Sequence, residues 1–249
     1  MPSPSLRPLD SAFGAEVTGL DLSSPMDAET KAAMNQAFLD HIVLVFRDQD
    51  LTAEEYRDSM AQFGEPMLQH NERFRLPKTP MVSRIINREK MRPASMWHTD
   101  HTNHERPPKA TVLYARKLPS KGGDTCFANM YAAYEGLSEK VKHDLAKLNV
   151  VHSWELSREN INRTLSQKEI DDAPPMVHPL VRVHPDTNRK CLFLGMHASH
   201  IDGQDIKTSR PLIESLEEHS TQEQFTFRHH WKDGDILMWD NRCLLHRAD

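Results

Sequence analysis

The stretch Trp97-His98-Thr99-Asp100 decides the expected fold, together with His246 near the end of the printed sequence. Side chains on an extended strand repeat every second residue, so His98 and Asp100 are expected to point to the same side and to reach one centre. His246 lies much too far along the chain to be joined to them by a local loop. The fold must therefore bring two remote strands together, as a barrel does.

The residue types at these positions indicate a metal centre. Two imidazoles and one carboxylate match the facial triad of mononuclear Fe(II) sites, in which three protein ligands leave the remaining coordination positions open. A His-x-Asp pair also arises by chance, and the chain has 15 histidines among 249 residues. A single histidine is therefore more often a surface or hydrogen-bonded residue, and the flanking segments have to decide.

Those flanking segments occur in a fixed order along almost the whole chain. They are Phe13 to Leu22, Val43 to Gln49, Trp97 to Asp100, Leu118 to Thr125 and Trp239 to Arg247. Together they resemble the taurine dioxygenase and chlorophenoxyacetate dioxygenase family of Fe(II)- and 2-oxoglutarate-dependent oxygenases.

The resemblance implies both a fold and a reaction. The fold is mainly β with flanking α-helices, a double-stranded β-helix (jelly-roll) barrel, which also suits the many short strands in the sequence. The implied cofactors are Fe(II), held by His98, Asp100 and His246, with 2-oxoglutarate and O2 as co-substrates. The implied reaction hydroxylates a small anionic compound (a sulfonate, sulfate ester or aryloxyalkanoate) and releases succinate and CO2. Related halogenases lack the carboxylate of Asp100, so its presence favours hydroxylation.

Binding of 2-oxoglutarate is where the sequence departs from the family. Thr125 matches the position whose hydroxyl contacts a carboxylate of 2-oxoglutarate. The family's arginine for the remote carboxylate lies about a dozen residues beyond the distal histidine, and the printed sequence ends at Asp249. Arg247 should point to the opposite face from His246, and Arg242 belongs to a segment that relatives have in addition to that arginine.

We therefore expect residues 1–249 to be one dioxygenase domain that lacks its C-terminal segment in the printed sequence. A buried carboxylate without its guanidinium partner would lose a charge-assisted pair worth about 1.5–3 kcal/mol. An intact mass equal to the 28.7 kDa of the printed chain would contradict this expectation.

Substrate contacts are expected from two places. In taurine dioxygenase a histidine shortly after a Phe-Gly pair contacts the sulfonate, and counting from Phe63-Gly64 the matching position is Gln69, with His70 one residue later. A solvated loop histidine is the alternative for His70. His101 and Asn103 would lie near the substrate only if the chain bends after Asp100.

Two further observations concern other histidines. The segment Gly195 to His200 resembles chlorophenoxyacetate dioxygenase and favours an aryloxyalkanoate-like acid. Four other histidines flank strands, prolines or a turn, where an imidazole ordinarily caps the backbone or faces water; they are His178, His184, His229 and His230.

Composition agrees with a cytoplasmic enzyme that binds small molecules. The formal net charge of −5 argues against nucleic acid as a partner. The mean hydropathy of −0.66 argues against a membrane protein, and the first residues do not resemble a secretory signal. Three scattered cysteines imply neither a disulfide framework nor a zinc knuckle. By resemblance, a homo-oligomer, either a dimer or a tetramer, is expected.

Periodicity and turn signals predict the other elements. We expect helices over Asp27 to Asp40, from a capping box at Thr52 and Glu55 to Phe63-Gly64, over Met130 to Leu148, and over Pro211 to Glu218 behind an N-cap at Ser209. Glu65 to Pro80 is expected to be a long loop. Strands are expected at Ile42 to Phe46, Ala110 to Ala115, Val150 to Trp154, Val177 to His184, Cys191 to Leu194, Phe225 to His229, Ile236 to Trp239 and Cys243 to His246.

Three functions remain open on the sequence alone. The first is the 2-oxoglutarate-dependent hydroxylase. The second is a metal-binding barrel without oxygenase activity, which the missing arginine would permit, and the third is an inactive scaffold of the same fold. Only the hydroxylase is expected to give the visible charge-transfer band of an Fe(II) chelate with 2-oxoglutarate under anaerobic conditions.

Overall fold

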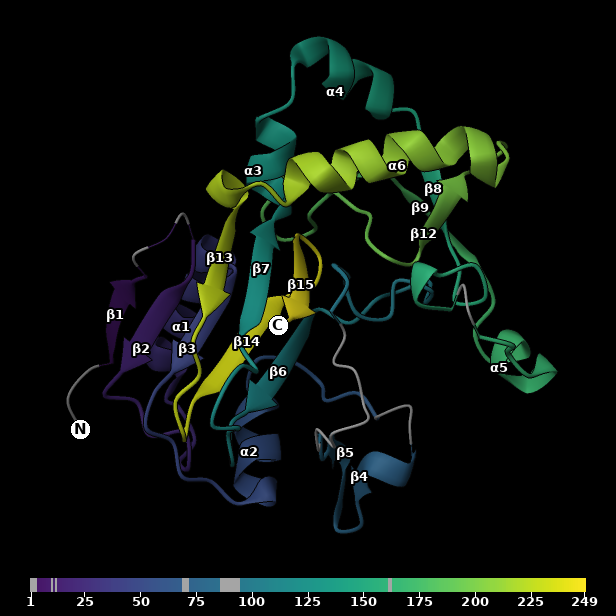
Figure 1. Cartoon of the computed structure of the whole chain (residues 1–249). Helices are drawn as coiled ribbons and strands as arrows, with labels where there is room; N and C mark the ends of the chain where they lie inside the picture. The colour runs from purple at the N-terminus through teal and green to yellow at the C-terminus, as the bar shows by residue number, and fades with distance from the viewer. Residues whose placement is uncertain (1–3, 10, 12, 69–71, 86–94, 161–162) are drawn as a thin grey trace. The chain divides into compact units, whose positions relative to one another are not determined.

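The computed structural model describes residues 4–9, 11, 13–68, 72–85, 95–160 and 163–249. Within these residues the chain forms strands β1–β15 and α-helices α1–α6, so the predicted fold class, mainly β with helices, is confirmed (Figure 1). The chain divides into two compact units. Unit 1 comprises residues 1–93, 112–123 and 231–239, and unit 2 comprises residues 94–111, 124–230 and 240–249. The single domain expected from the sequence stays a prediction.

Unit 1 contains most residues of one five-stranded sheet, of order β1-β2-β3-β14-β6. In β3 every side chain is buried, which makes it the core strand that the β-branched run predicted. The predicted N-terminal helices are confirmed: α1 is capped by Asp27, and α2 opens with the capping box of Thr52 and Glu55. The elements are β1 (Ser5–Pro8), β2 (Ala15–Thr18), α1 (Ala28–His41), β3 (Val43–Phe46), α2 (Ala53–Met60), β6 (Ala110–Tyr114) and β14 (Ile236–Asp240).

The segment predicted as a long loop, Glu65 to Pro80, has more structure than expected. A 3-10 turn at Glu72–Phe74 leads into a hairpin of β4 (Arg75–Leu76) and β5 (Thr79–Ser83), with residues 69–71 outside the described part. The presence of Pro80 does not exclude this strand, because β5 is an edge strand, where proline is tolerated, and Pro80 is its second residue.

Unit 2 holds three small antiparallel sheets, of strand orders β13-β7-β15, β12-β8-β9 and β10-β11. Its longest helix, α6, packs against β12 and α3 (Figure 1). The strands are β7 (Thr125–Asn129), β8 (Asn149–His152), β9 (Met176–Pro179), β10 (Val181–Val183), β11 (Lys190–Leu192), β12 (Ala198–Ile201), β13 (Thr226–His229) and β15 (Leu244–Ala248); the helices are α3 (Met130–Glu135), α4 (Glu139–Leu145), α5 (Gln167–Asp171) and α6 (Ile206–Ser220).

Two predicted helices have different bounds. The helix expected over Met130 to Leu148 is broken at Gly136, where an added Cβ would lie 2.9 Å from the Phe225 ring, and Ser138 caps the second half. The helix α6 begins at Ile206 because Asp205 is its N-cap. Ser209, predicted as the cap, lies inside α6, and its hydroxyl donates to the Asp205 carbonyl oxygen at 2.9 Å.

Each strand expected from the sequence has a counterpart in the structure, but one of them is divided. The single strand expected over Val177 to His184 is divided at Leu180 into β9, which pairs with β8, and β10, which pairs with β11. The Leu180 N–H donates to the Leu148 carbonyl oxygen, and the Leu180 carbonyl oxygen accepts from the Phe193 N–H. Strands β1, β4, β5, β7 and β12 were not predicted. In the described part of the chain, no helix is both long and apolar enough to cross a bilayer.

Candidate active site

An antiparallel bridge between His98 and His246 brings the two remote segments of the predicted site together. The His98 N–H donates to the His246 carbonyl oxygen at 3.0 Å, and the His246 N–H donates to the His98 carbonyl oxygen at 2.8 Å. Residues that exchange both backbone bonds stand directly opposite each other, so their side chains leave the same face. The two imidazole ring centroids are accordingly 4.1 Å apart.

Asp100 reaches the same point from a shorter strand than the sequence suggested. His98 is an isolated bridge residue and Asp100 already begins a turn, so the expected extended strand does not continue. The buried Thr99 holds this segment in place, because its hydroxyl donates to the Leu244 carbonyl oxygen at 2.7 Å. The carboxylate is in turn oriented by Thr111, whose hydroxyl donates to Asp100 Oδ2 at 2.5 Å and accepts from Asn241 Nδ2 at 2.8 Å.

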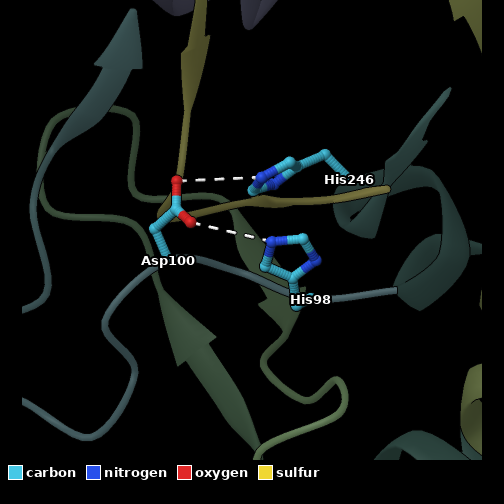
Figure 2. A group of neighbouring side chains, drawn as sticks. All are labelled: His98, Asp100 and His246. Atoms are coloured by element: carbon cyan, nitrogen blue, oxygen red, sulfur yellow. Dashed lines mark ion pairs between the residues drawn. The ribbon is translucent and has the colours of Figure 1, made fainter. Parts of the chain in front are cut away.

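The three side chains point at a common centre (Figure 2). His98 Nε2 lies 3.7 Å from Asp100 Oδ1, and His246 Nε2 lies 3.7 Å from Asp100 Oδ2. One ligand atom from each residue falls within 4.8 Å of the other two. The structure therefore brings His98, Asp100 and His246 together in the arrangement that the sequence predicted.

The protonation states of these groups fit a divalent metal ion. His98 Nδ1 lies 2.8 Å from the Met96 carbonyl oxygen, to which an Nδ1–H donates, so the Nε2 lone pair is left facing Asp100. Burial lowers the pKa of His246 to about 3, which keeps its imidazole neutral. Although burial alone would raise the pKa of Asp100, its neighbours His246 and His98 hold it below the usual range. Two imidazoles and a carboxylate are the donor set of a facial triad.

A glycine next to His98 allows a third segment to approach the site. Gly195 has φ +129°, and a Cβ there would lie 3.2 Å from His98 Cα, 3.2 Å from Leu245 Cδ2 and 3.3 Å from the Trp97 carbonyl oxygen. The following residue, Met196, donates its N–H to that same Trp97 oxygen at 2.9 Å. Only glycine combines this backbone conformation with so close a contact.

Thr125 lies on the same sheet face as His246. In the sheet β13-β7-β15, Phe127 of β7 pairs with His246 of β15, and Thr125 pairs with Ala248. Residues two apart on a strand share a face, so Thr125 and His246 face the same side. Arg247 falls in the intervening row with Cys126, on the opposite face, as expected from the sequence.

Residues 5–249 match the family described as Taurine catabolism dioxygenase TauD, TfdA family. The chain belongs to this TauD/TfdA family. It is 34% identical to the alpha-ketoglutarate-dependent 2,4-dichlorophenoxyacetate dioxygenase of Burkholderia sp. (strain RASC), over 98% of this chain and 87% of that protein. It is 32% identical to an alpha-ketoglutarate-dependent sulfate ester dioxygenase of Pseudomonas putida, over 98% of this chain and 83% of that protein.

Solved structures give the same assignment. A crystal structure of a taurine dioxygenase from Burkholderia xenovorans matches with a TM-score of 0.85 and 35% identity, over 99% of this chain and 83% of that one. AAD-2, crystallised with Mn(II) and N-oxalylglycine, matches with a TM-score of 0.84 and 32% identity, over 99% and 91%. The predicted family and enzyme class, a 2-oxoglutarate-dependent non-haem iron dioxygenase, and the predicted cofactors are confirmed.

The predicted substrate residues of this TauD/TfdA enzyme are only partly described. Gln69 and His70 lie outside the described residues. His101 has φ +52° and Asn103 follows in the same turn, so the chain does bend after Asp100, which was the condition for their approach. Their contact with a substrate stays a prediction.

Sequence reasoning gave no role to His197, which is buried near the triad. Burial lowers its pKa to about 4, and His98, Asp100 and His101 are among the neighbours that influence this pKa. Its Nδ1 lies 3.1 Å from the Ser157 hydroxyl. The sequence signal that could have found His197 was the resemblance of the segment Gly195 to His200 to a relative. That resemblance covered the whole segment and did not distinguish His197 from His200.

Three of the histidines expected to cap the backbone or face water are buried, and two of them, His178 and His184, do contact the backbone. His178, His184 and His229 are each at most 5% exposed, whereas His230 is exposed as expected. His178 Nε2 lies 2.9 Å from the Thr102 carbonyl oxygen and 3.1 Å from that of His104, so it fastens the turn that follows Asp100.

A second cluster in unit 2 has a similar composition. The potential ligand atoms of His184, Asp240 and Cys243 also lie within 4.8 Å of one another. His184 Nδ1 accepts from two backbone N–H groups, at 3.2 and 3.3 Å, and its Nε2 lies 3.1 Å from Asp240 Oδ2. Arg242 donates to both carboxylate oxygens of Asp240, at 2.8 and 2.6 Å. Because both ring nitrogens and both carboxylate oxygens are engaged, we assign this cluster a structural role.

Proposed function

We propose that this enzyme holds Fe(II) with His98, Asp100 and His246, binds 2-oxoglutarate beside Thr125, and hydroxylates a small anionic organic substrate. The observation that carries the proposal is the convergence of two Nε2 atoms and one carboxylate on a single centre, each 3.7 Å from its neighbour in the set. The products would be the hydroxylated compound, succinate and CO2. In this reaction class, Fe(II) with 2-oxoglutarate supplies the activation of O2.

In this proposal the protein holds the ligand atoms of His98, Asp100 and His246 in fixed positions and directs their lone pairs toward the metal. His98 is oriented by the Met96 carbonyl oxygen, and Asp100 by the Thr111 hydroxyl. Both histidines are 7% exposed, so bulk water has little access to their rings. Such outer hydrogen bonds tune ligand basicity and ring orientation.

For the fold we propose the jelly-roll barrel. Support comes from the structural neighbours, which are TauD-type dioxygenases with that fold. The antiparallel sheet β13-β7-β15, which carries His246 at its edge strand β15, is the part of such a barrel that bears a ligand on a strand. Ligands on paired strands are held to tighter geometry than ligands on loops.

Among substrates, we propose an aryloxyalkanoate, sulfate ester or sulfonate, since relatives that act on 2,4-dichlorophenoxyacetate, (S)-phenoxypropionate and sulfate esters are 32–34% identical over nearly the full chain. His197 is a candidate to bind the anionic group. If Ser157 donates to Nδ1, the ring presents an Nε2–H donor near the metal centre. His101, Asn103, Gln69 and His70 remain the other candidates.

Two measurements test this function. Anaerobic protein with Fe(II) and 2-oxoglutarate should develop the visible charge-transfer band of the chelate, whereas a metal-binding barrel without oxygenase function or an inactive scaffold should not. With O2 present, succinate release should rise when the right member of a panel of aryloxy acids, sulfate esters and sulfonates is added. Absence of the band in the wild-type protein would overturn the proposal.

A further inference from the structure

The sheet β13-β7-β15 carries two successive rows of side chains on the face that holds His246. The first row is Phe227, Phe127 and His246, one residue from each strand. The second row is His229, Thr125 and Ala248, again one from each strand. The rings of the first row are in contact, with the Phe127 centroid 5.3 Å from that of Phe227 and 6.4 Å from that of His246.

His229 and Thr125 share the face of His246 because the register requires it. Directly opposed residues in an antiparallel pair leave the same face, and rows two residues apart leave the same face again. The row between them, Arg228, Cys126 and Arg247, leaves the other face. Arg228 is accordingly 42% exposed, whereas His229 is 3% exposed.

The second row lies within reach of a ligand bound at the metal centre. Strands are about 4.8 Å apart and rise about 3.3 Å per residue, so the Thr125 Cα lies about 8 Å from the His246 Cα. Thr125 and His229, on neighbouring strands, stand directly opposite each other. On the other side of Thr125, the row ends in Ala248, whose side chain is only a methyl group.

A carboxylate that enters this row needs hydrogen-bond donors. Thr125 and His229 are both buried, at 7% and 3% exposure, and an ionised carboxylate removed from water is costly unless donors replace its hydration. A single hydroxyl supplies one donor, whereas a carboxylate has about four acceptor positions. The row supplies a second donor in the imidazole of His229.

We propose that His229 is a co-substrate-binding residue, which donates a ring N–H to the remote carboxylate of 2-oxoglutarate while the Thr125 hydroxyl binds the same group. This inference rests on the proposed function, because it places the metal-chelating end of 2-oxoglutarate beside His246 and its other end in the second row.

The test compares two 2-oxo acids by the charge-transfer band of the anaerobic Fe(II) protein. 2-Oxoglutarate has the remote carboxylate, and 2-oxopentanoate has the same carbon chain ending in a methyl group. In His229→Phe the dissociation constant for 2-oxoglutarate should rise about 10- to 100-fold, because a hydrogen bond to a charged group is worth one to two decades of affinity. The dissociation constant for 2-oxopentanoate should stay within about threefold of the wild-type value.

The control is Arg228→Gln, on the same strand and the opposite face, which should change neither dissociation constant. If the phenyl ring of His229→Phe does not fit and the variant fails to fold, His229→Leu is used for the same comparison. A change below about threefold for 2-oxoglutarate, or an equal loss for both acids, overturns the inference. A wild-type protein that gives no band with either acid would instead overturn the proposed function, so the two failures are distinguishable.

Discussion

Two clusters of histidine and acidic side chains in unit 2 invite comparison: the triad of His98, Asp100 and His246, and the cluster of His184, Asp240 and Cys243. In each, the potential ligand atoms lie within 4.8 Å of one another. Each combines a residue pair from one short segment with a histidine from a remote one. Composition and proximity do not separate them.

Hydrogen bonding does separate them. In the triad, His98 uses only Nδ1 for the backbone, and its Nε2 faces Asp100 at 3.7 Å, too far for a hydrogen bond. In the second cluster, His184 uses both ring nitrogens, and the Asp240 carboxylate is held by Arg242 on both oxygens. Burial also raises the pKa of the Cys243 thiol, so the thiolate that a metal requires is disfavoured. The two clusters are therefore distinguished by whether a histidine Nε2 is already within hydrogen-bond distance of the carboxylate of its own cluster.

The largest expected effect is from Asp100→Ala. Replacement of an outer partner of a metal ligand already costs about 10–100-fold in metal affinity. Loss of the carboxylate itself should therefore abolish both the chelate band and succinate release. The free energy of unfolding of the metal-free protein should change by less than about 1 kcal/mol, because Asp100 is a site residue on a preformed framework. Anaerobic Fe(II) titration and denaturant unfolding provide the two readouts.

His98→Ala should behave in the same way and serves as a second ligand variant. If either variant kept succinate production, the assignment of the triad would be wrong. A large drop in stability with normal metal affinity would show instead that the triad is structural and would reverse the comparison.

The second cluster should give the opposite pattern. Asp240→Ala leaves Arg242, whose side chain is 12% exposed, with only the exposed carboxylate of Asp186 as its ion-pair partner. Breaking a buried ion pair from one side costs about 3–5 kcal/mol, and denaturant unfolding should show a loss of that size. The Fe(II) affinity of the folded protein should remain close to the wild-type value.

A double variant checks the cause. Asp240→Ala with Arg242→Leu removes both charges and should recover part of the lost stability, because no uncompensated charge is left behind. Lost Fe(II) affinity in Asp240→Ala at unchanged stability would make the second cluster a metal site after all.

The triad was predictable from the sequence because it depends on a two-residue spacing and on long flanking segments. The same sequence did not reveal that His178, His184 and His229 are buried. Their burial depends on partners remote in the chain, such as the Thr102 carbonyl oxygen for His178. Whether a histidine nitrogen is engaged or free is decided by those partners, so the sequence alone cannot distinguish the two clusters.

Strand β7 was missed for a related reason. All five of its side chains are buried, so Thr125–Asn129 shows no alternation of polar and apolar residues. The helix over Met130 to Leu148 was predicted as continuous although Gly136 and the N-cap Ser138 were visible in the sequence. Local signals located most strands and helices and also included the helix break at Gly136, which was overlooked, whereas the fully buried strand required tertiary contacts.

A smaller effect is expected from Thr111→Val, which keeps the shape of the side chain and removes the hydroxyl that orients Asp100. Metal affinity should fall about 10–100-fold, as for other outer hydrogen-bond partners of metal ligands. The matched control is Thr221→Val at the end of α6, where the lost hydroxyl bonds only to the Glu217 carbonyl oxygen. Equal Fe(II) affinities in the two variants would remove Thr111 from the site.

The smallest effect on Fe(II) binding is expected from Gly195→Ala, which leaves the side chains of His98, Asp100 and His246 unchanged. The added Cβ would meet the His98 backbone at 3.2 Å in a conformation, φ +129°, that alanine rarely adopts, so stability should fall by about 1–3 kcal/mol. Gly203 also has a positive φ, +80°, but an added Cβ there meets nothing within 4 Å, and Gly203→Ala should cost only about 1 kcal/mol.

The two alanine variants differ in what the Cβ touches, so their difference in unfolding free energy and in Fe(II) affinity measures how much the triad depends on the close approach of Gly195. The three ligand side chains are intact in both variants. A loss of Fe(II) affinity in Gly195→Ala alone would therefore mean that the position of the His98 backbone sets the direction of the His98 Nε2 lone pair. That backbone is held by the bridge to His246 on one side and by Gly195 on the other. Equal behaviour of the two variants would contradict that dependence and leave the hydrogen bond to Met96 as the feature that orients His98.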